Sequence, residues 1–172
     1  MRSVLCMLLG VIALGGCVSE TTNSTIGASS PRKVRRVTPP PPSSPINEIA
    51  LLKGMRPLDT TGNGFPNRLE VSVYLFSRPY PVPRFAEGTL VFTLQAPSET
   101  RELLAEWQFG SREMASARFR DVIGQGYKLN LDLEAIGVAS FPYESADLRV
   151  AFEPASGGKV QPGGTQAVSY RH

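Results

Sequence analysis

The sequence predicts an all-β domain, an antiparallel β-sandwich of about seven strands with one short helix, on a disordered tether rich in Pro, Ser and Thr. Two observations carry this prediction. Apolar and polar residues alternate over five segments between residues 70 and 153, and Gly- and Pro-rich stretches separate these segments. Strict alternation is typical of half-buried strands, and regular turn signals are typical of a sandwich. A small barrel would show the same periodicity and stays an alternative.

The strands follow one another along the chain with few interruptions. In residues 70–76, Val71, Val73 and Leu75 alternate with Ser72, Tyr74 and Phe76. The other four clear strands and two weaker ones at the ends of the domain are predicted at 89–95, 103–109, 127–133 and 147–153, and at 49–58 and 166–170. Turns are expected at 77–83, 124–126 and 155–164, where Gly and Pro gather.

One segment departs from the alternation and predicts the short helix. Ser111 is of the residue type that caps a helix N-terminus. Over residues 112–121 and just beyond, Ala115, Phe119 and Val122 recur at helical spacing. We therefore expect a helix that begins after Ser111.

The start of the chain has the features of an export signal. Arg2 supplies a positive charge, and residues 4–14 form an apolar run of eleven residues. A membrane-spanning helix needs about 20 apolar residues, so a transmembrane anchor fits this run less well. We expect residues 1–16 to be a signal peptide, 17–46 the tether and 47–172 the folded domain.

The end of this signal resembles the bacterial lipobox. Leu14, Gly15, Gly16 and Cys17 give an aliphatic residue, two small residues and a cysteine in the right order. The resemblance implies that a diacylglycerol is attached to the thiol of Cys17, that residues 1–16 are removed, and that the new amino terminus is acylated. Residue 18 is Val rather than Asp, which in many Gram-negative bacteria implies sorting to the outer membrane.

The tether holds the one cluster of charges in the sequence. Its composition cannot bury enough apolar surface to offset the ordering entropy, so a disordered spacer is expected, with a Pro-rich ligand segment as the alternative. The cluster consists of Arg32, Lys33, Arg35 and Arg36. Residues 47–172 carry 13 bases and 14 acids, so they are nearly neutral. The cluster therefore predicts contact with an anionic membrane surface, and binding of nucleic acid is not expected.

Residues 59–70 resemble the twelve-residue calcium loop of EF-hands, dockerins and thrombospondin type 3 repeats. In that family, oxygen ligands come from positions 1, 3, 5, 7, 9 and 12, and a glycine, here Gly64, stands at position 6. The resemblance implies a calcium site whose ligands would be Asp59, Thr61, Asn63, Phe65 through its carbonyl, Asn67 and Glu70. Thr61 departs from the pattern, which expects an acid or amide there. A metal-free turn is the alternative, because Thr, Gly and Asn are also turn residues.

Catalysis is not expected. The single histidine is His172, the last residue, and a frayed terminus rarely holds catalytic geometry. Of the two cysteines, Cys6 leaves with the signal and Cys17 is the expected lipid acceptor. Serine hydrolase triads and His-rich zinc sites therefore lack their parts. Residues 124–128 also lack the helix-opening glycine that a dinucleotide-binding loop requires.

The remaining expectation is a membrane-anchored binding or adaptor module of the cell envelope, whose partner is an envelope protein or a glycan. The arrangement of strands resembles C2-like and immunoglobulin-like sandwiches, a likeness of architecture that carries no function. The candidate contact residues are Arg78, Tyr80, Arg84 and Phe85, of types that dominate binding surfaces. The aromatic pair could instead cap the core. A structural subunit of an envelope assembly is the alternative function.

Overall fold

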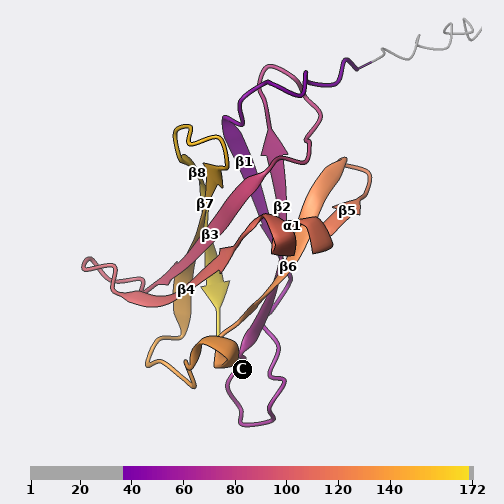
Figure 1. Ribbon diagram of the computed structural model, residues 1–172. Helices are drawn as coiled ribbons and strands as arrows, with labels where there is room; N and C mark the ends of the chain where they lie inside the picture. Colours follow the sequence, from indigo (N-terminus) through magenta and orange to yellow (C-terminus); the bar gives the residue numbers. More distant parts are fainter. Residues whose placement is uncertain (1–36, 171–172) are drawn as a thin grey trace, which may run out of the picture. The chain divides into compact units, whose positions relative to one another are not determined.

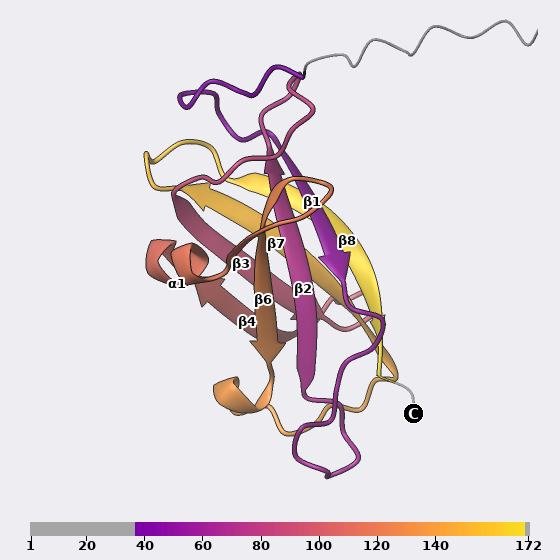
Figure 2. The ribbon, with the colours of Figure 1, turned by 90° about the vertical axis from the view of Figure 1, so that its right-hand side faces the viewer.

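The protein folds into a β-sandwich of two four-stranded antiparallel sheets (Figures 1 and 2). A computed structural model describes residues 37–170. One sheet has the strand order β1-β2-β6-β5 and the other has the order β4-β3-β7-β8. The strands are β1 (Glu48–Lys53), β2 (Arg68–Phe76), β3 (Gly88–Gln95), β4 (Leu103–Phe109), β5 (Arg118–Arg120), β6 (Gln125–Asp132), β7 (Ser145–Pro154) and β8 (Gln161–Ser169). The predicted sandwich is confirmed.

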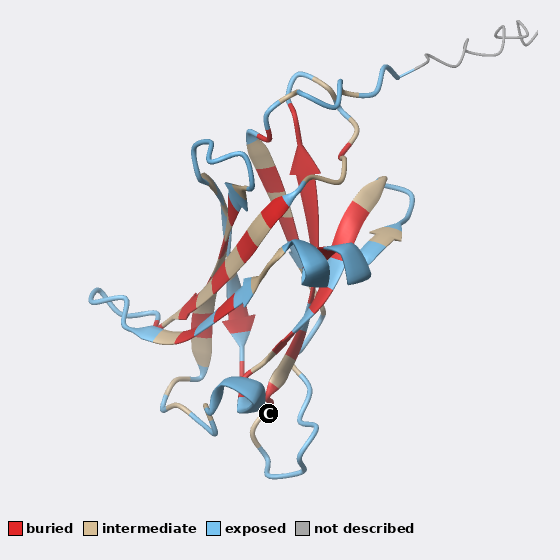
Figure 3. Cartoon of the chain, viewed as in Figure 1, coloured by how far each residue is buried: buried red, intermediate tan, exposed pale blue. Residues whose placement is uncertain are grey.

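The core lies between the two sheets and is built by the alternation seen in the sequence (Figure 3). In β3, Leu90, Phe92 and Leu94 are fully buried, whereas the residues between them are only partly buried. Two hydrogen bonds also join the sheets. The Trp107 indole donates to the Asp132 carbonyl at 2.9 Å, and the Gln166 amide donates to the Leu51 carbonyl at 3.1 Å. Apolar burial and these bonds together fix how one sheet faces the other.

All seven predicted strands exist, with shifted ends. The largest shift is in β8, which begins at Gln161, inside the stretch predicted as a turn. Pro162 can lie in this strand because β8 is at the edge of its sheet, where a missing N–H group costs no ladder bond. The pairing with β7 is irregular between Arg149 and Ala151. The first strand is shorter than predicted and ends at Lys53, with an isolated bridge at Leu58.

The predicted helix is wrong over its second half. Helix α1 covers only Ser111–Ser116, and residues 118–120 form an eighth strand, β5, on the edge of β6. Lys128 donates its backbone N–H to the Ala117 carbonyl at 2.9 Å, which begins this pairing. Tertiary pairing therefore overrides the helical spacing. Ser111 does not cap the helix either, because the N-cap is Gly110 and the Ser111 hydroxyl donates to the Gly88 carbonyl.

The outer face of β2 is covered, although its residues alternate like those of a solvent-facing strand. Tyr74 and Phe76 are both buried. The Phe119 ring, on β5, packs against the Tyr74 ring at 5.8 Å between centroids, and the Tyr74 hydroxyl donates to Asp121 at 2.6 Å. Phe119 and Asp121 thus cover Tyr74 on this face, and the Arg78 guanidinium lies over Phe76. Desolvation by burial raises the pKa of Tyr74 to about 12, and the Asp121 carboxylate adds to this effect.

We predict that stability falls as the pH rises from 10 to about 12, in part because of Tyr74. A tyrosine in the unfolded chain ionises near pH 10, before Tyr74 does in the folded chain. Between these two pKa values ionisation stabilises only the unfolded state, so the free energy of unfolding falls. The stabilising effect is complete below pH 10. In urea titrations across this range, Tyr74→Phe is expected to show a shallower decline than the wild type. Parallel declines would contradict the assigned pKa of Tyr74.

The packed domain includes the end of the segment predicted as tether. Ile46 is buried in the core, and the Ser44 carbonyl accepts a hydrogen bond from Arg84. Packing therefore begins before residue 47, the predicted first residue of the domain. Within residues 37–170, no helix has the length and apolar character needed to cross a bilayer.

Candidate binding site

A pocket of about 650 Å³ opens at one end of the sandwich. Four segments contribute to its lining: residues 42–46, residues 84–87 of the loop between β2 and β3, Arg118 of β5, and residues 152–161, from the end of β7 to the start of β8. Figure 1 shows residues 42–46, the β2–β3 loop and the β7–β8 turn at the same end of the domain. Its lining includes Ile46, Arg84, Phe85, Glu87, Arg118, Phe152 and Lys159. Volumes of this size are typical of ligand sites with a mainly apolar wall and a few polar groups. We refer to it as the end pocket.

Arg84 is held in the pocket wall by neutral acceptors. Its side chain donates to the Ser77 hydroxyl at 3.1 Å and to the Ser44 carbonyl, and its backbone N–H donates to the Leu75 carbonyl at 2.9 Å. These bonds join residues 42–46 to the loop after β2. Because no acceptor in this set is charged, the positive charge of Arg84 is not neutralised by its partners.

Phe85 lines the pocket and packs against Tyr127, a fully buried residue of β6 that is not part of the lining. Their rings meet edge to face at 5.5 Å, and the Phe85 N–H donates to Gln125 at 3.0 Å. The Tyr127 hydroxyl both accepts from the Ala86 N–H at 2.8 Å and donates to the Ala86 carbonyl at 3.0 Å. Burial raises the pKa of Tyr127, against the opposing effect of the nearby Arg118 and Arg84 charges.

Arg118 completes the wall from β5. Its guanidinium carbon lies 4.9 Å from the centre of the Phe85 ring, an arrangement that attracts the cation to the ring face. No carboxylate of residues 37–170 lies within ion-pair distance of Arg118, Arg84 or Lys159. Sequence reasoning missed Arg118 and Lys159, because one fell in the predicted helix and the other in a predicted turn. The pairing of β5 with β6 is what brings Arg118 to Phe85.

The four predicted contact residues divide into two groups. Arg84 and Phe85 line the end pocket, whereas Arg78 and Tyr80 do not. Arg78 forms an ion pair with Glu48 and lies over the Phe76 ring at 4.9 Å. The hydrogen bond from Arg78 lowers the pKa of Glu48. Arg78 is thus committed to bonds within the domain.

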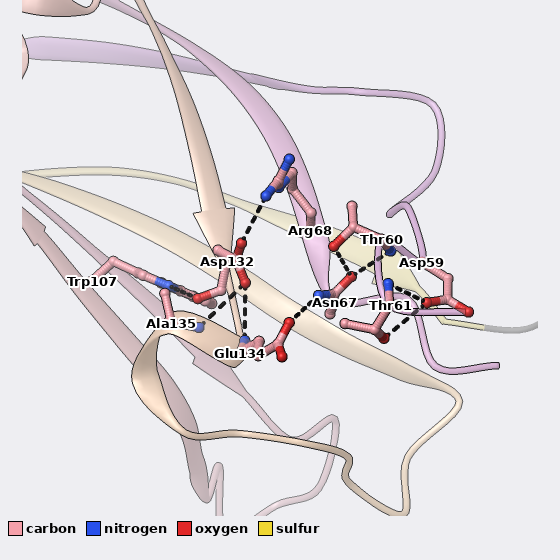
Figure 4. Close-up of polar contacts among 9 residues, drawn as sticks. All are labelled: Asp59, Thr60, Thr61, Asn67, Arg68, Trp107, Asp132, Glu134 and Ala135. Atoms are coloured by element: carbon pink, nitrogen blue, oxygen red, sulfur yellow. Dashed lines mark hydrogen bonds and ion pairs between the residues drawn. The ribbon is translucent and has the colours of Figure 1, made fainter. Parts of the chain in front are cut away.

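The predicted calcium loop is organised around Asp59 (Figure 4). Its carboxylate accepts backbone N–H bonds from Thr61, Gly62 and Gly64 at 2.7–3.0 Å, and the Thr61 hydroxyl adds a fourth bond. The bond from Gly64 is the largest cause of the lowered pKa of Asp59. Gly62 and Gly64 both have positive φ, which a tight loop around one carboxylate requires. These four bonds hold the loop around the Asp59 carboxylate.

The other predicted ligands have partners of their own. The Asn63 side chain accepts from the Phe65 N–H, and buried Asn67 accepts from the N–H and hydroxyl of Thr60 and donates to Glu134 (Figure 4). Phe65 packs its ring on Phe141 and Tyr170. Glu70 forms an ion pair with Lys128 at 3.0 Å. In residues 37–170, no group of three or more His, Cys, Asp or Glu side chains comes together. Calcium binding stays a prediction.

Thermal unfolding of the full-length chain distinguishes a structural role of Asp59 from calcium binding by this loop. We predict that Asp59→Ala lowers the melting temperature with excess chelator present, because four hydrogen bonds to the loop are lost. Glu99→Ala, which removes an exposed carboxylate from another loop, should have little effect. Equal melting of Asp59→Ala and wild type in chelator would contradict the structural assignment. A calcium-dependent rise of the wild type that Asp59→Ala abolishes would support the calcium prediction.

The predictions for Cys17 and for Arg32, Lys33, Arg35 and Arg36 lie outside the described residues. A search with family models gave no match, and a search of curated proteins gave none either.

Proposed function

We propose that this chain is a lipid-anchored lipoprotein of the bacterial cell envelope whose β-sandwich is a non-catalytic binding module. The observation that carries the binding proposal is the end pocket, where Arg84 and Phe85, predicted as contact residues, meet Arg118 and Lys159. An envelope protein or a glycan is the partner we propose.

The wall of the pocket supports binding because it is fixed before any ligand arrives. Arg84 and Phe85 are each held by at least two bonds or ring contacts within the domain. A wall of this kind loses little conformational entropy when a partner binds. The pocket also includes residues 42–46, so its rim lies where the tether joins the domain.

The chemistry of the described residues supports binding rather than catalysis. Residues 37–170 contain neither histidine nor cysteine. Four carboxylates have lowered pKa values: Glu48, Asp59, Asp121 and Asp132. A general acid requires the opposite shift, toward the working pH. Glu87, the one carboxylate in the end pocket, has no second carboxylate beside it in the lining.

The anchor rests on the sequence. In this proposal Cys17 carries the acyl chains, which give durable attachment, and Arg32, Lys33, Arg35 and Arg36 lie near anionic lipid. We place the protein in the outer membrane because Val18 follows the cysteine.

Photo-crosslinking in the native membrane tests the binding proposal. A photoreactive side chain at Ser156, on the rim of the end pocket, should capture one partner reproducibly. The same group at Thr165, an exposed residue of β8 that is not part of the lining, is the matched control. Capture only from Thr165, or from neither position, would contradict the proposal. Capture of one stoichiometric protein from both positions would favour a structural subunit.

Cys17→Ser should release the protein from the membrane or leave it unprocessed. Without a thiol at this position no diacylglycerol can be attached, and the single cleavage route of a lipoprotein is closed. Membrane fractionation and the intact mass of the mature chain check this. Cys6→Ser is the matched control and should change neither. Full membrane retention of an unmodified Cys17→Ser chain would refute the anchor.

A further inference from the structure

The end pocket concentrates positive charge on a nearly neutral domain. Residues 47–172 carry 13 bases and 14 acids. The lining of the pocket has three cations, Arg84, Arg118 and Lys159, and one carboxylate, Glu87. None of the four forms an ion pair within residues 37–170. By contrast, three cations outside the pocket each form an ion pair with a carboxylate: Arg68, Arg78 and Lys128.

The two guanidinium groups are positioned but not neutralised. Arg84 is bound by a hydroxyl and by carbonyl oxygens, and Arg118 is held over the face of Phe85. Stacking uses the planar face of a guanidinium, so its hydrogen bonds come from the edge N–H groups. One edge of Arg118 faces the Tyr127 hydroxyl, and the remaining N–H groups can turn toward a ligand. Both cations lie beside Phe85, since Arg84 directly precedes it in the chain and Arg118 lies over its ring. An oxyanion is the group that such an arrangement binds best.

The pocket also offers apolar surface beside these cations. Within its lining Phe85 is partly exposed, whereas Ile46 and Phe152 are buried. We propose that the end pocket binds a ligand through a carboxylate or phosphate group, which Arg118 contacts directly together with Lys159, while an adjoining apolar part of the ligand packs against Phe85. This inference rests on the proposed function and adds the chemistry of the ligand.

Nuclear magnetic resonance of the full-length chain tests this chemistry with three probes that share a phenyl ring. Benzoate and phenyl phosphate carry the two candidate oxyanions on an apolar ring, and benzamide is the neutral control. Both anions are expected to shift the side-chain Nε–H resonance of Arg118 and the backbone resonance of Ala86 in a saturable way, and benzamide is not. The tighter of the two anions identifies the group that the pocket prefers.

Arg118→Gln should weaken binding of the preferred anion at least about tenfold, because a hydrogen bond between charged groups is lost. Arg112→Gln, which removes an exposed arginine outside the pocket, is the matched control and should leave the affinity unchanged. Unchanged spectra elsewhere in the domain confirm that Arg118→Gln is folded. Equal shifts with benzamide and benzoate, or equal anion affinity of Arg118→Gln and wild type, would overturn the inference.

The two proposals fail in different ways. Capture of a partner at Ser156 without binding of either anion would overturn the ligand chemistry and leave the binding module in place. Anion binding without capture of any partner would overturn the proposed function and support the site.

Discussion

Phe92→Ala is expected to lower the free energy of unfolding by about 3–5 kcal/mol. Phe92 is fully buried in β3, at the centre of its sheet, where it pairs with Trp107 on β4 and Val150 on β7. Its ring also meets Phe109 edge to face at 5.8 Å. Neighbouring strands hold these side chains in place, so the cavity cannot collapse easily. Urea unfolding followed by Trp107 fluorescence measures the change.

Leu103→Ala is the control for this truncation. Leu103 lies on β4 but is 55% exposed, so its loss leaves no cavity. The expected change is within about 0.5 kcal/mol. A Phe92→Ala variant as stable as Leu103→Ala would mean that the two sheets do not pack as described.

Gly88→Ala is expected to destabilise the domain by the full cost of overpacking, about 1–3 kcal/mol or more. A Cβ atom at Gly88 would meet the Glu153 carbonyl oxygen and would lie 2.7 Å from two atoms of the Phe152 ring. The carbonyl belongs to the paired strand β7, so it cannot move without disturbing the ladder. The melting temperature and urea midpoint of the purified chain report the loss.

The matched control is Gly164→Ala, a change of the same size on β8. A Cβ atom there meets nothing within 4 Å. This variant should be as stable as wild type or slightly more stable, since alanine restricts the unfolded chain. Equal stability of the two alanine variants would contradict the close approach of β3 and β7 at Gly88.

Periodicity predicted the sandwich because its strands are half-buried. Leu90, Phe92 and Leu94 alternate with partly exposed residues, and the sequence shows the same alternation. The assignment of each strand to one of the two sheets was not predictable, because alternation shows which face of a strand is buried but not which strands pair. Sheet order depends on distant pairings, such as that of β3 with β7.

The segment from α1 to β6 shows where local patterns fail. Phe119 fits helical spacing with Ala115, yet it lies in β5, where its ring packs on Tyr74 and its backbone pairs with Gly126. Phe119 and Tyr74 are about 45 positions apart in the chain. No local pattern contains that information. The same pairing places Arg118 in the end pocket, so the missed strand and the missed site residue have one cause.

Two of the four candidate contact residues lie in the end pocket. Arg84 and Phe85 were chosen for residue type, and both line the end pocket. Residue type could not separate them from Arg78, whose pairing with Glu48 joins residues 30 positions apart. Sequence spacing likewise says nothing of the ion pair between Glu70 and Lys128 on the neighbouring strand. Which ion pair each of these side chains forms depends on residues that are distant in sequence and that the fold brings close.

Hydrogen–deuterium exchange tests most directly the central claim that the end pocket is the binding site. The full-length chain is compared in its native membranes and after purification in detergent. We predict slower exchange in the native membrane for three segments of the pocket, 42–46, 84–87 and 156–161. Unchanged exchange in all three segments, with protection confined to another surface such as the outer face of β3 and β7, would contradict the account.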